Sequence, residues 1–130
     1  MKKVNQKKIH DPEKGINGDC WRASTASVLE LPIEEVPAFE DMSNRDAWHE
    51  YVKVLGKNGY GLYSVYVEAV EKHPIMLEDE CEYYFMIGPS PRFPNENHQC
   101  VGYKGKLIHD PHPDKTGLKS LRSIEILVKL

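Results

Sequence analysis

A run of small side chains, "ASTAS" at residues 23–27, is the feature that most restricts the fold. It lies in the segment Cys20–Leu31, which we expect to be helical because Gly18 and Asp19 supply a turn and an N-cap. The helix should stop at Leu31, because the residue before a proline disfavours the α conformation. Small side chains form no amphipathic stripe, but they let neighbouring elements approach the helix backbone closely. The run therefore predicts a buried helix.

A second helix is expected in "SNRDAWHEYVKVLGKNG", residues 43–59. Trp48, Tyr51, Val52 and Leu55 have the spacing of one helix face, and Gly59 supplies a left-handed stop. The second half of the chain is instead rich in β-branched and aromatic residues, which are typical of strands. The expected strands are "GLYSVYV", "YYFMI", "HQCVGY", "KLIHD" and "SIEILVKL". Helices followed by antiparallel strands predict the α+β class.

Length and charge limit the function classes. A chain of 130 residues is expected to form one domain, residues 1–130, with a core that needs no disulfide or metal. The formal net charge of -3 argues against a general nucleic-acid binder. No segment has the length and apolarity of a membrane span, and no apolar run near the N-terminus resembles a secretion signal. Three cysteines, Cys20, Cys81 and Cys100, cannot all pair, so we expect a cytoplasmic chain with reduced thiols.

Cys20 begins the first expected helix. Unsatisfied backbone N–H groups and the helix dipole at this position favour a thiolate, which is what a nucleophile needs. Free buried cysteines are common and usually inert, so a general base must accompany the thiol. His98 begins one expected strand and Asp110 ends the next, which makes them the candidate base and its orienting partner.

Three other histidines, His10, His49 and His73, lie on the second helix or among turn residues and are expected at the surface.

The register of one hairpin decides whether His98 and Asp110 share a face of the sheet. A three-residue loop from Tyr103 to Gly105 would place the two side chains directly opposite each other. A two-residue loop of Lys104 and Gly105 would put them on opposite faces. The sequence is compatible with both loop lengths.

A cysteine at a helix N-terminus, a histidine on a later strand and an aspartate on the next strand resemble the papain-like cysteine peptidase and amidase superfamily. The motifs are "GDCWRAS" around Cys20, "NHQCVGY" around His98 and "LIHDPHP" around Asp110, and together they span most of the chain. "GPSPR" and "HDPHP" also resemble motifs of small proteins of bacteria and phages. The resemblance implies a papain-like domain, with N-terminal helices packed on a C-terminal antiparallel sheet, in the cytoplasm of a bacterium or a phage-infected cell.

The resemblance also implies roles for the residues. Cys20 would attack a carbonyl and form a thioester, His98 would transfer the proton and Asp110 would fix the imidazole tautomer. The protein would be a hydrolase or acyltransferase acting on a peptide or small amide, without a cofactor or metal.

The oxyanion hole would use the Cys20 backbone N–H and one side-chain donor. The papain pattern places a glutamine a few residues before the cysteine, whereas this chain has Gln6 far upstream and Asn17 close by. We favour Asn17 as the donor, and we expect Trp21 and Arg92 to contact the substrate.

Two other function classes remain open. A binding module that keeps the fold without the reaction, such as a phage-encoded inhibitor or a peptide-binding protein, would use "GPSPRFPNEN" as its recognition loop. Arg92 in that loop offers a planar fork for a carboxylate or phosphate, although the loop is equally typical of a plain connection. A zinc site is the less favoured alternative, because no CxxC pair is present. Its candidate ligands would be His98, Cys100, His109, Asp110 and His112.

Overall fold

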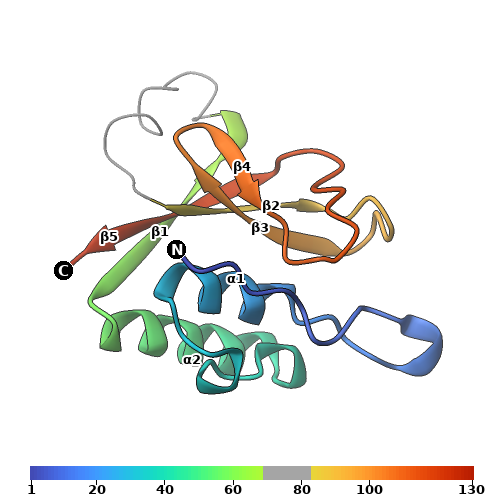
Figure 1. Cartoon of the computed structure of the whole chain (residues 1–130), viewed down its shortest axis with the longest axis horizontal. Helices are drawn as coiled ribbons and strands as arrows, with labels where there is room; N and C mark the ends of the chain where they lie inside the picture. The colour runs from blue at the N-terminus through green and yellow to red at the C-terminus, as the bar shows by residue number, and fades with distance from the viewer. Residues whose placement is uncertain (69–82) are drawn as a thin grey trace.

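The computed structural model describes residues 1–68 and 83–130 (Figure 1). The helices are α1 (Cys20–Leu29) and α2 (Asn44–Lys57), with short 3-10 turns at Pro12–Lys14, Ile33–Glu35 and Phe39–Asp41. The strands are β1 (Tyr60–Tyr66), β2 (Tyr84–Pro89), β3 (Asn97–Tyr103), β4 (Lys106–His109) and β5 (Ser123–Lys129). Among the described helices, none is long and apolar enough to cross a membrane.

The strands form one sheet in the order β1-β5-β2-β3-β4, in which all neighbours are antiparallel. Both helices lie on the same side of this sheet, with α1 packed on β3 and α2 against β1 (Figure 1). The expected α+β class is therefore confirmed, and the five expected strands all form.

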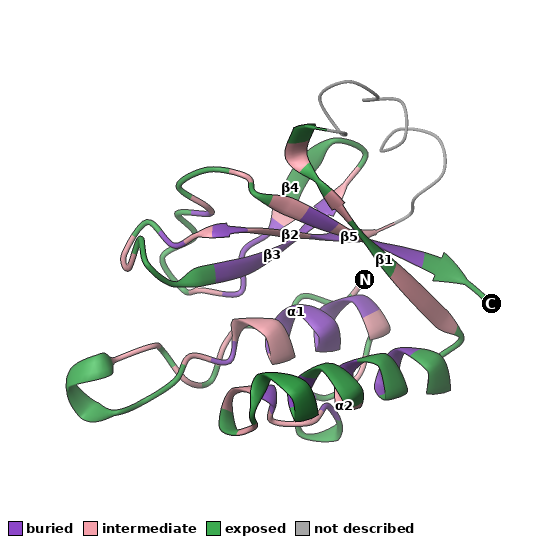
Figure 2. Cartoon of the chain, turned by 180° about the vertical axis from the view of Figure 1, so that it is seen from behind, coloured by how far each residue is buried: buried purple, intermediate pink, exposed green. Residues whose placement is uncertain are grey.

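Helix α1 is buried, as its small side chains predict. Every residue from Ala23 to Val28 is buried, and α1 lies between α2 and the sheet (Figure 2). The buried hydroxyls are satisfied inside the helix: Ser24 and Thr25 donate to the carbonyl of Trp21, at 3.1 and 2.8 Å. The helix ends at Leu29, earlier than the proline suggests, because Glu30 takes a left-handed conformation with φ of 57°.

The expected apolar face of α2 is only half correct. Tyr51 and Leu55 are fully buried, but Trp48 and Val52 are 42% and 47% exposed. The buried face also includes Ala47 and Val54, so it is rotated away from the predicted stripe. The rotation places the large Trp48 ring at the surface and lets the small Ala47 face the rest of the fold.

The core lies mainly between the helices and the sheet. Tyr51 and Leu55 of α2 pack there with Phe85 of β2 and Val101 of β3. A smaller cluster contains Tyr84, Ile124 and Ile126. Because alternate residues of a strand point to opposite faces, Tyr84 and Phe85 belong to different clusters.

The N-terminal segment is tied to both α1 and the end of β4. Asp19 was expected to cap α1, but its side chain makes no capping bond. Its buried carboxylate instead accepts the backbone N–H groups of Lys7 and Lys8, at 3.1 and 3.0 Å. The backbone N–H of Gln6 donates to the carbonyl of Pro111 at 2.8 Å. The first residues of the chain therefore connect the start of α1 with the loop after β4.

The segment that follows Lys119 runs so close to β2 that Gly88 has no room for a side chain. A Cβ at Gly88 would lie 1.9 Å from the backbone oxygen of Ser120. We expect Gly88→Ala to lower the free energy of unfolding by about 1–3 kcal/mol, because a backbone must move. Urea unfolding monitored by circular dichroism measures the change.

Gly56→Ala is the matched control. Gly56 lies in α2, and a Cβ there would meet nothing within 4 Å. Replacing a helical glycine by alanine should raise stability by about 0.5–1 kcal/mol. Equal stability of Gly88→Ala and the wild type would contradict the close approach of the Ser120 backbone to β2.

Candidate functional site

Cys20 and His98 line one cavity of about 620 Å³. Cys20 is the first residue of α1, and His98 lies at the start of β3, the strand on which α1 packs. The packing of the helix on the strand therefore brings together two residues that are far apart in the sequence. Cys20 is half-buried and His98 is buried, so the thiol is the more accessible of the two groups.

His98 and Asp110 form a buried pair. Nε2 of His98 lies 2.7 Å from Oδ1 of Asp110, and both side chains are almost fully buried. The Asp110 carboxylate also accepts the backbone N–H groups of His112 and Gly117, at 2.9 and 2.7 Å. Three donors therefore hold the carboxylate in place, and the bond to Nε2 leaves Nδ1 of the imidazole for another partner.

The hairpin loop is not the one that would by itself place His98 and Asp110 on the same face. Its loop is the two-residue alternative, with Lys104 and Gly105 both in the left-handed region and Tyr103 opposite Lys106. This loop alone would place His98 and Asp110 on opposite faces. A β-bulge next to Val101 shifts the register by one residue, so that Val101 pairs with His109. The bulge returns the two side chains to the same face.

Hydrogen bonds control the charges of the pair. Burial by itself lowers the pKa of His98, but the hydrogen bond with Asp110 and the nearby thiols of Cys100 and Cys20 outweigh it and raise that pKa to about 11. Burial also opposes ionisation of Asp110, yet its hydrogen bonds from His98 and two backbone N–H groups hold its pKa well below the usual range. At neutral pH the pair is therefore an imidazolium and a carboxylate.

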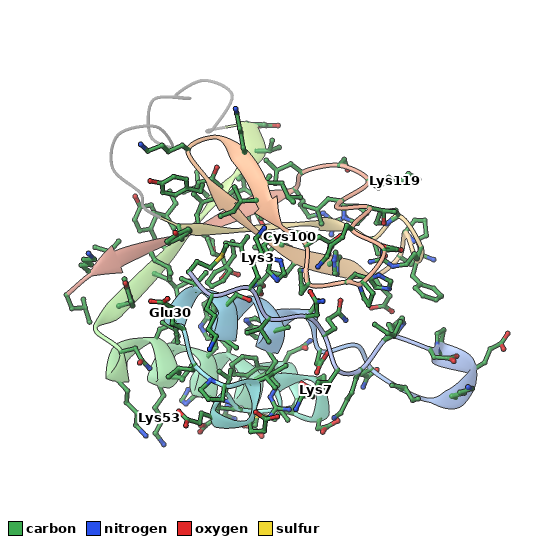
Figure 3. The ribbon with its side chains drawn as sticks, viewed as in Figure 1. Lys3, Lys7, Glu30, Lys53, Cys100 and Lys119 are labelled. Carbon is green, nitrogen blue, oxygen red and sulfur yellow. The ribbon has the colours of Figure 1, made fainter. Side chains whose placement is uncertain are left out.

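Two thiols lie against the His98 side chain. Cys20 and Cys100 both lie close enough to it to raise the pKa of the imidazole. Cys100 is completely buried near the centre of the fold (Figure 3), and burial raises the pKa of its thiol. Cys81 lies outside the described residues.

The amides of Gln6 and Asn17 both line the cavity. Asn17 is exposed, and its Nδ2 donates to the carbonyl of Glu40 at 3.2 Å. Gln6 is half-buried, and a side chain at Gly18 would meet its Nε2 at 3.2 Å. The N-terminal segment therefore brings a glutamine to the turn just before Cys20. Sequence spacing did not indicate the position of Gln6, because that position depends on the long-range hydrogen bonds of the Asp19 carboxylate.

Arg92 and Trp21, the expected substrate contacts, also line the cavity, but each has a partner within the protein. Nη1 of Arg92 binds both carboxylate oxygens of Asp114, at 2.9 and 3.0 Å. Asp114 thus occupies one nitrogen of the guanidinium fork, and the role of Arg92 in substrate binding stays a prediction. The Trp21 ring packs against Phe39 and Tyr51, at centroid distances of 4.6 and 5.0 Å, so it belongs partly to the core.

The cluster of possible zinc ligands is divided by the fold. His98, Cys100 and Asp110 come together, with their ligand atoms within 4.8 Å of one another. Nε2 of His109 instead contacts the carbonyl of Val4 at 2.8 Å, and Nδ1 of His112 contacts Asp114 at 3.0 Å.

The histidines expected at the surface differ. His49 is exposed, as predicted, but His10 is half-buried. Its ring packs edge-on against Phe93 at 5.0 Å. His73 lies outside the described residues.

Asp110→Asn should lower the free energy of unfolding by about 3 kcal/mol near neutral pH, because it leaves a buried imidazolium without its counter-charge. The folded protein holds the pKa of Asp110 below its unfolded value, so the stabilisation is present above about pH 4 and is lost as the pH falls further. The difference in stability between the two proteins should therefore be smaller at about pH 3 than at about pH 6. Urea unfolding at both pH values measures it.

Asp46→Asn, at an exposed position in α2, is the control and should leave the pH dependence unchanged. A constant difference between the wild type and Asp110→Asn at both pH values would contradict the ionised pair.

Comparison of the chain with family models, with curated proteins and with solved structures found no match. The interpretation of the site therefore rests on its own geometry.

Proposed function

We propose that this protein is a papain-like thiol hydrolase or acyltransferase that acts through a thioester on Cys20. The observation that carries the proposal is the orientation of His98: its Nε2 binds Asp110, which leaves Nδ1 for a proton transfer with a thiol. Cys20 supports the proposal because it lines the same cavity as His98 and lies close enough to raise the pKa of the imidazole. Nucleophile, base and orienting carboxylate then act in series.

The reactive form would be a Cys20 thiolate beside a protonated His98. The raised pKa of His98 keeps the imidazole charged at neutral pH. The thiolate attacks the carbonyl carbon of an amide. As the C–N bond breaks, Nδ1–H of His98 protonates the leaving amine, and the acyl group remains on Cys20 as a thioester. Neutral His98 then takes a proton from water, which hydrolyses the thioester, or from an amine, which receives the acyl group.

Asp110 would keep His98 in the orientation that these proton transfers require. Its carboxylate is fixed by the backbone N–H groups of His112 and Gly117, so it holds Nε2 and not Nδ1. The same carboxylate stabilises the imidazolium of the resting state.

The oxyanion formed during attack would be bound by the backbone N–H of Cys20 and the side-chain amide of Gln6. The sequence favours Asn17 by proximity, but the Asn17 amide donates to Glu40 at an exposed position. One hydrogen of the Gln6 amide donates to the carbonyl of Lys8 at 3.0 Å, and the second remains for a ligand.

The cavity suits a short peptide or a small amide. Its volume of about 620 Å³ is within the usual range for small-molecule sites, roughly 300–1,000 Å³. Trp21 and Trp48 contribute apolar surface to it, and Glu40 and His112 contribute polar groups. Because the nucleophile must stay reduced, we place the protein in a reducing compartment such as the bacterial cytoplasm.

Labelling with a small electrophile tests the proposal. In the wild type at about pH 6, a peptidyl or acyl electrophile should modify Cys20 much faster than Cys100, because Cys20 opens to the cavity beside His98 whereas Cys100 is fully buried. Cys20→Ala should remove this label. His98→Ala should lower the labelling rate by about 10²-fold or more, since it removes the imidazole that activates the thiol. Peptide mass spectrometry assigns each modified residue.

His49→Ala is the matched control, because His49 is exposed on α2 and should not affect the rate. Unchanged labelling in His98→Ala would mean that Cys20 is an ordinary thiol. The protein would then be a binding module that keeps the fold without the reaction.

Gln6→Ala and Asn17→Ala separate the two candidate oxyanion donors. We expect Gln6→Ala to lower the turnover number for p-nitrophenyl acetate hydrolysis by about 10²–10³-fold, and Asn17→Ala to lower it far less. Iodoacetamide alkylation of Cys20 needs no oxyanion hole, so its rate should stay unchanged in both variants. A larger loss in Asn17→Ala than in Gln6→Ala would reverse the assignment.

A further inference from the structure

Cys100 has no part in the proposed reaction, yet it is buried beside the proposed base. Its side chain points to the same face of β3 as His98, because the two residues are separated by one position in a strand. Cys100 is fully buried, and its thiol lies within 4.8 Å of a ring nitrogen of His98. Packing alone does not explain why a polarisable thiol lies beside the proposed base and away from solvent.

The thiol completes a compact set of metal ligands. One ligand atom each from His98, Cys100 and Asp110 lies within 4.8 Å of the others, and all three residues are buried. In a tetrahedral zinc site with bonds of about 2.0–2.3 Å, ligand atoms are roughly 3.3–3.8 Å apart, so the most distant of these atoms need to approach by about 1–1.5 Å. Nε2 of His98 and Oδ1 of Asp110, which are 2.7 Å apart, need to separate slightly. Nitrogen, sulfur and carboxylate oxygen together match Zn²⁺, whereas Mg²⁺ and Ca²⁺ require oxygen ligands.

The backbone already holds the three ligands close to these positions. His98 and Cys100 belong to β3, which is paired on both sides with β2 and β4. Asp110 is fixed by the backbone N–H groups of His112 and Gly117. Little conformational entropy is therefore lost when the ligands close around an ion.

We propose that His98, Cys100 and Asp110 form a binding site for Zn²⁺, and that the bound ion reversibly inhibits the enzyme. The cavity that His98 lines gives an ion a route to the site. The ion replaces the protons carried by the Cys100 thiol and the imidazole. Because it occupies the proposed base, it is an inhibitor and not a cofactor.

The inhibition rests on the proposed function, whereas the metal site does not. An ion bound to His98 and Asp110 breaks the hydrogen bond between them and occupies the imidazole that the proposed reaction needs. Metal binding and acyl transfer therefore exclude each other at this site.

The test is a titration of the metal-free, reduced full chain with Zn²⁺ alone, in competition with a colorimetric chelator. We expect one ion per chain in the wild type and a dissociation constant at least about 10-fold higher in Cys100→Ser. Cys81→Ser should bind as the wild type does. Equal affinity in the wild type and Cys100→Ser, or a loss confined to Cys81→Ser, would overturn the proposal.

Co²⁺ gives a second measurement that does not depend on the folding of a variant. In the wild type, Co²⁺ should produce the d–d absorption of a tetrahedral site together with thiolate-to-metal charge-transfer bands. Octahedral spectra without those bands would contradict the assigned ligands. Circular dichroism of Cys100→Ser shows whether lost affinity reflects lost structure.

Electrophile labelling separates this inference from the proposed function. If the metal-free protein labels at Cys20 but Zn²⁺ neither binds nor protects, the metal site is wrong and the hydrolase proposal stands. If Zn²⁺ binds through Cys100 but His98→Ala labels like the wild type, the site stands as a metal site and the catalytic proposal fails.

Discussion

The Asp110 carboxylate is the group around which the candidate site is organised. A buried carboxylate is costly unless it is paired and hydrogen-bonded, and Asp110 receives donors from three directions. Two of them, the N–H groups of His112 and Gly117, fold the segment after β4 into a compact loop. The third is His98 on the neighbouring strand. The requirement to satisfy one charge thus determines the loop, the orientation of the imidazole and the nitrogen that remains for a thiol.

A second buried carboxylate, Asp19, organises the other side of the cavity. It accepts the backbone N–H groups of Lys7 and Lys8, so the N-terminal segment lies against the start of α1. The same segment bonds to the carbonyl of Pro111, directly after Asp110. The start of α1, with the proposed nucleophile, and the loop that holds Asp110 are therefore joined by the N-terminal segment. The same segment brings Gln6 to the cavity.

The position of Cys100 suggests that reaction and inhibition share one set of side chains. In the proposed reaction, His98 exchanges a proton with Cys20 while Asp110 holds it. In the proposed inhibited state, His98 and Asp110 surround an ion together with Cys100. Both states require close, pre-oriented donors in a buried place, because low polarity strengthens both the hydrogen bond and the metal bond. A site built for one state is therefore already close to the geometry of the other.

Local patterns in the sequence determined the elements and the order of the candidate residues. The small-residue run after Cys20 requires a buried helix, and the composition of the second half requires strands. These features depend on short-range sterics and side-chain type, which the sequence displays directly. The order of Cys20, His98 and Asp110 could be recognised for the same reason.

Only the tertiary structure decided the register, the rotation of α2 and the positions of Asp19 and Gln6. The bulge beside Val101 shifts the hairpin by one residue, and it forms where the buried pair of His98 and Asp110 satisfies its charges. The Asp19 side chain does not cap its own helix and instead accepts the backbone N–H groups of Lys7 and Lys8. Each of these outcomes depends on contacts between segments far apart in the chain. The free energies of those contacts exceed the local conformational preferences that the sequence displays.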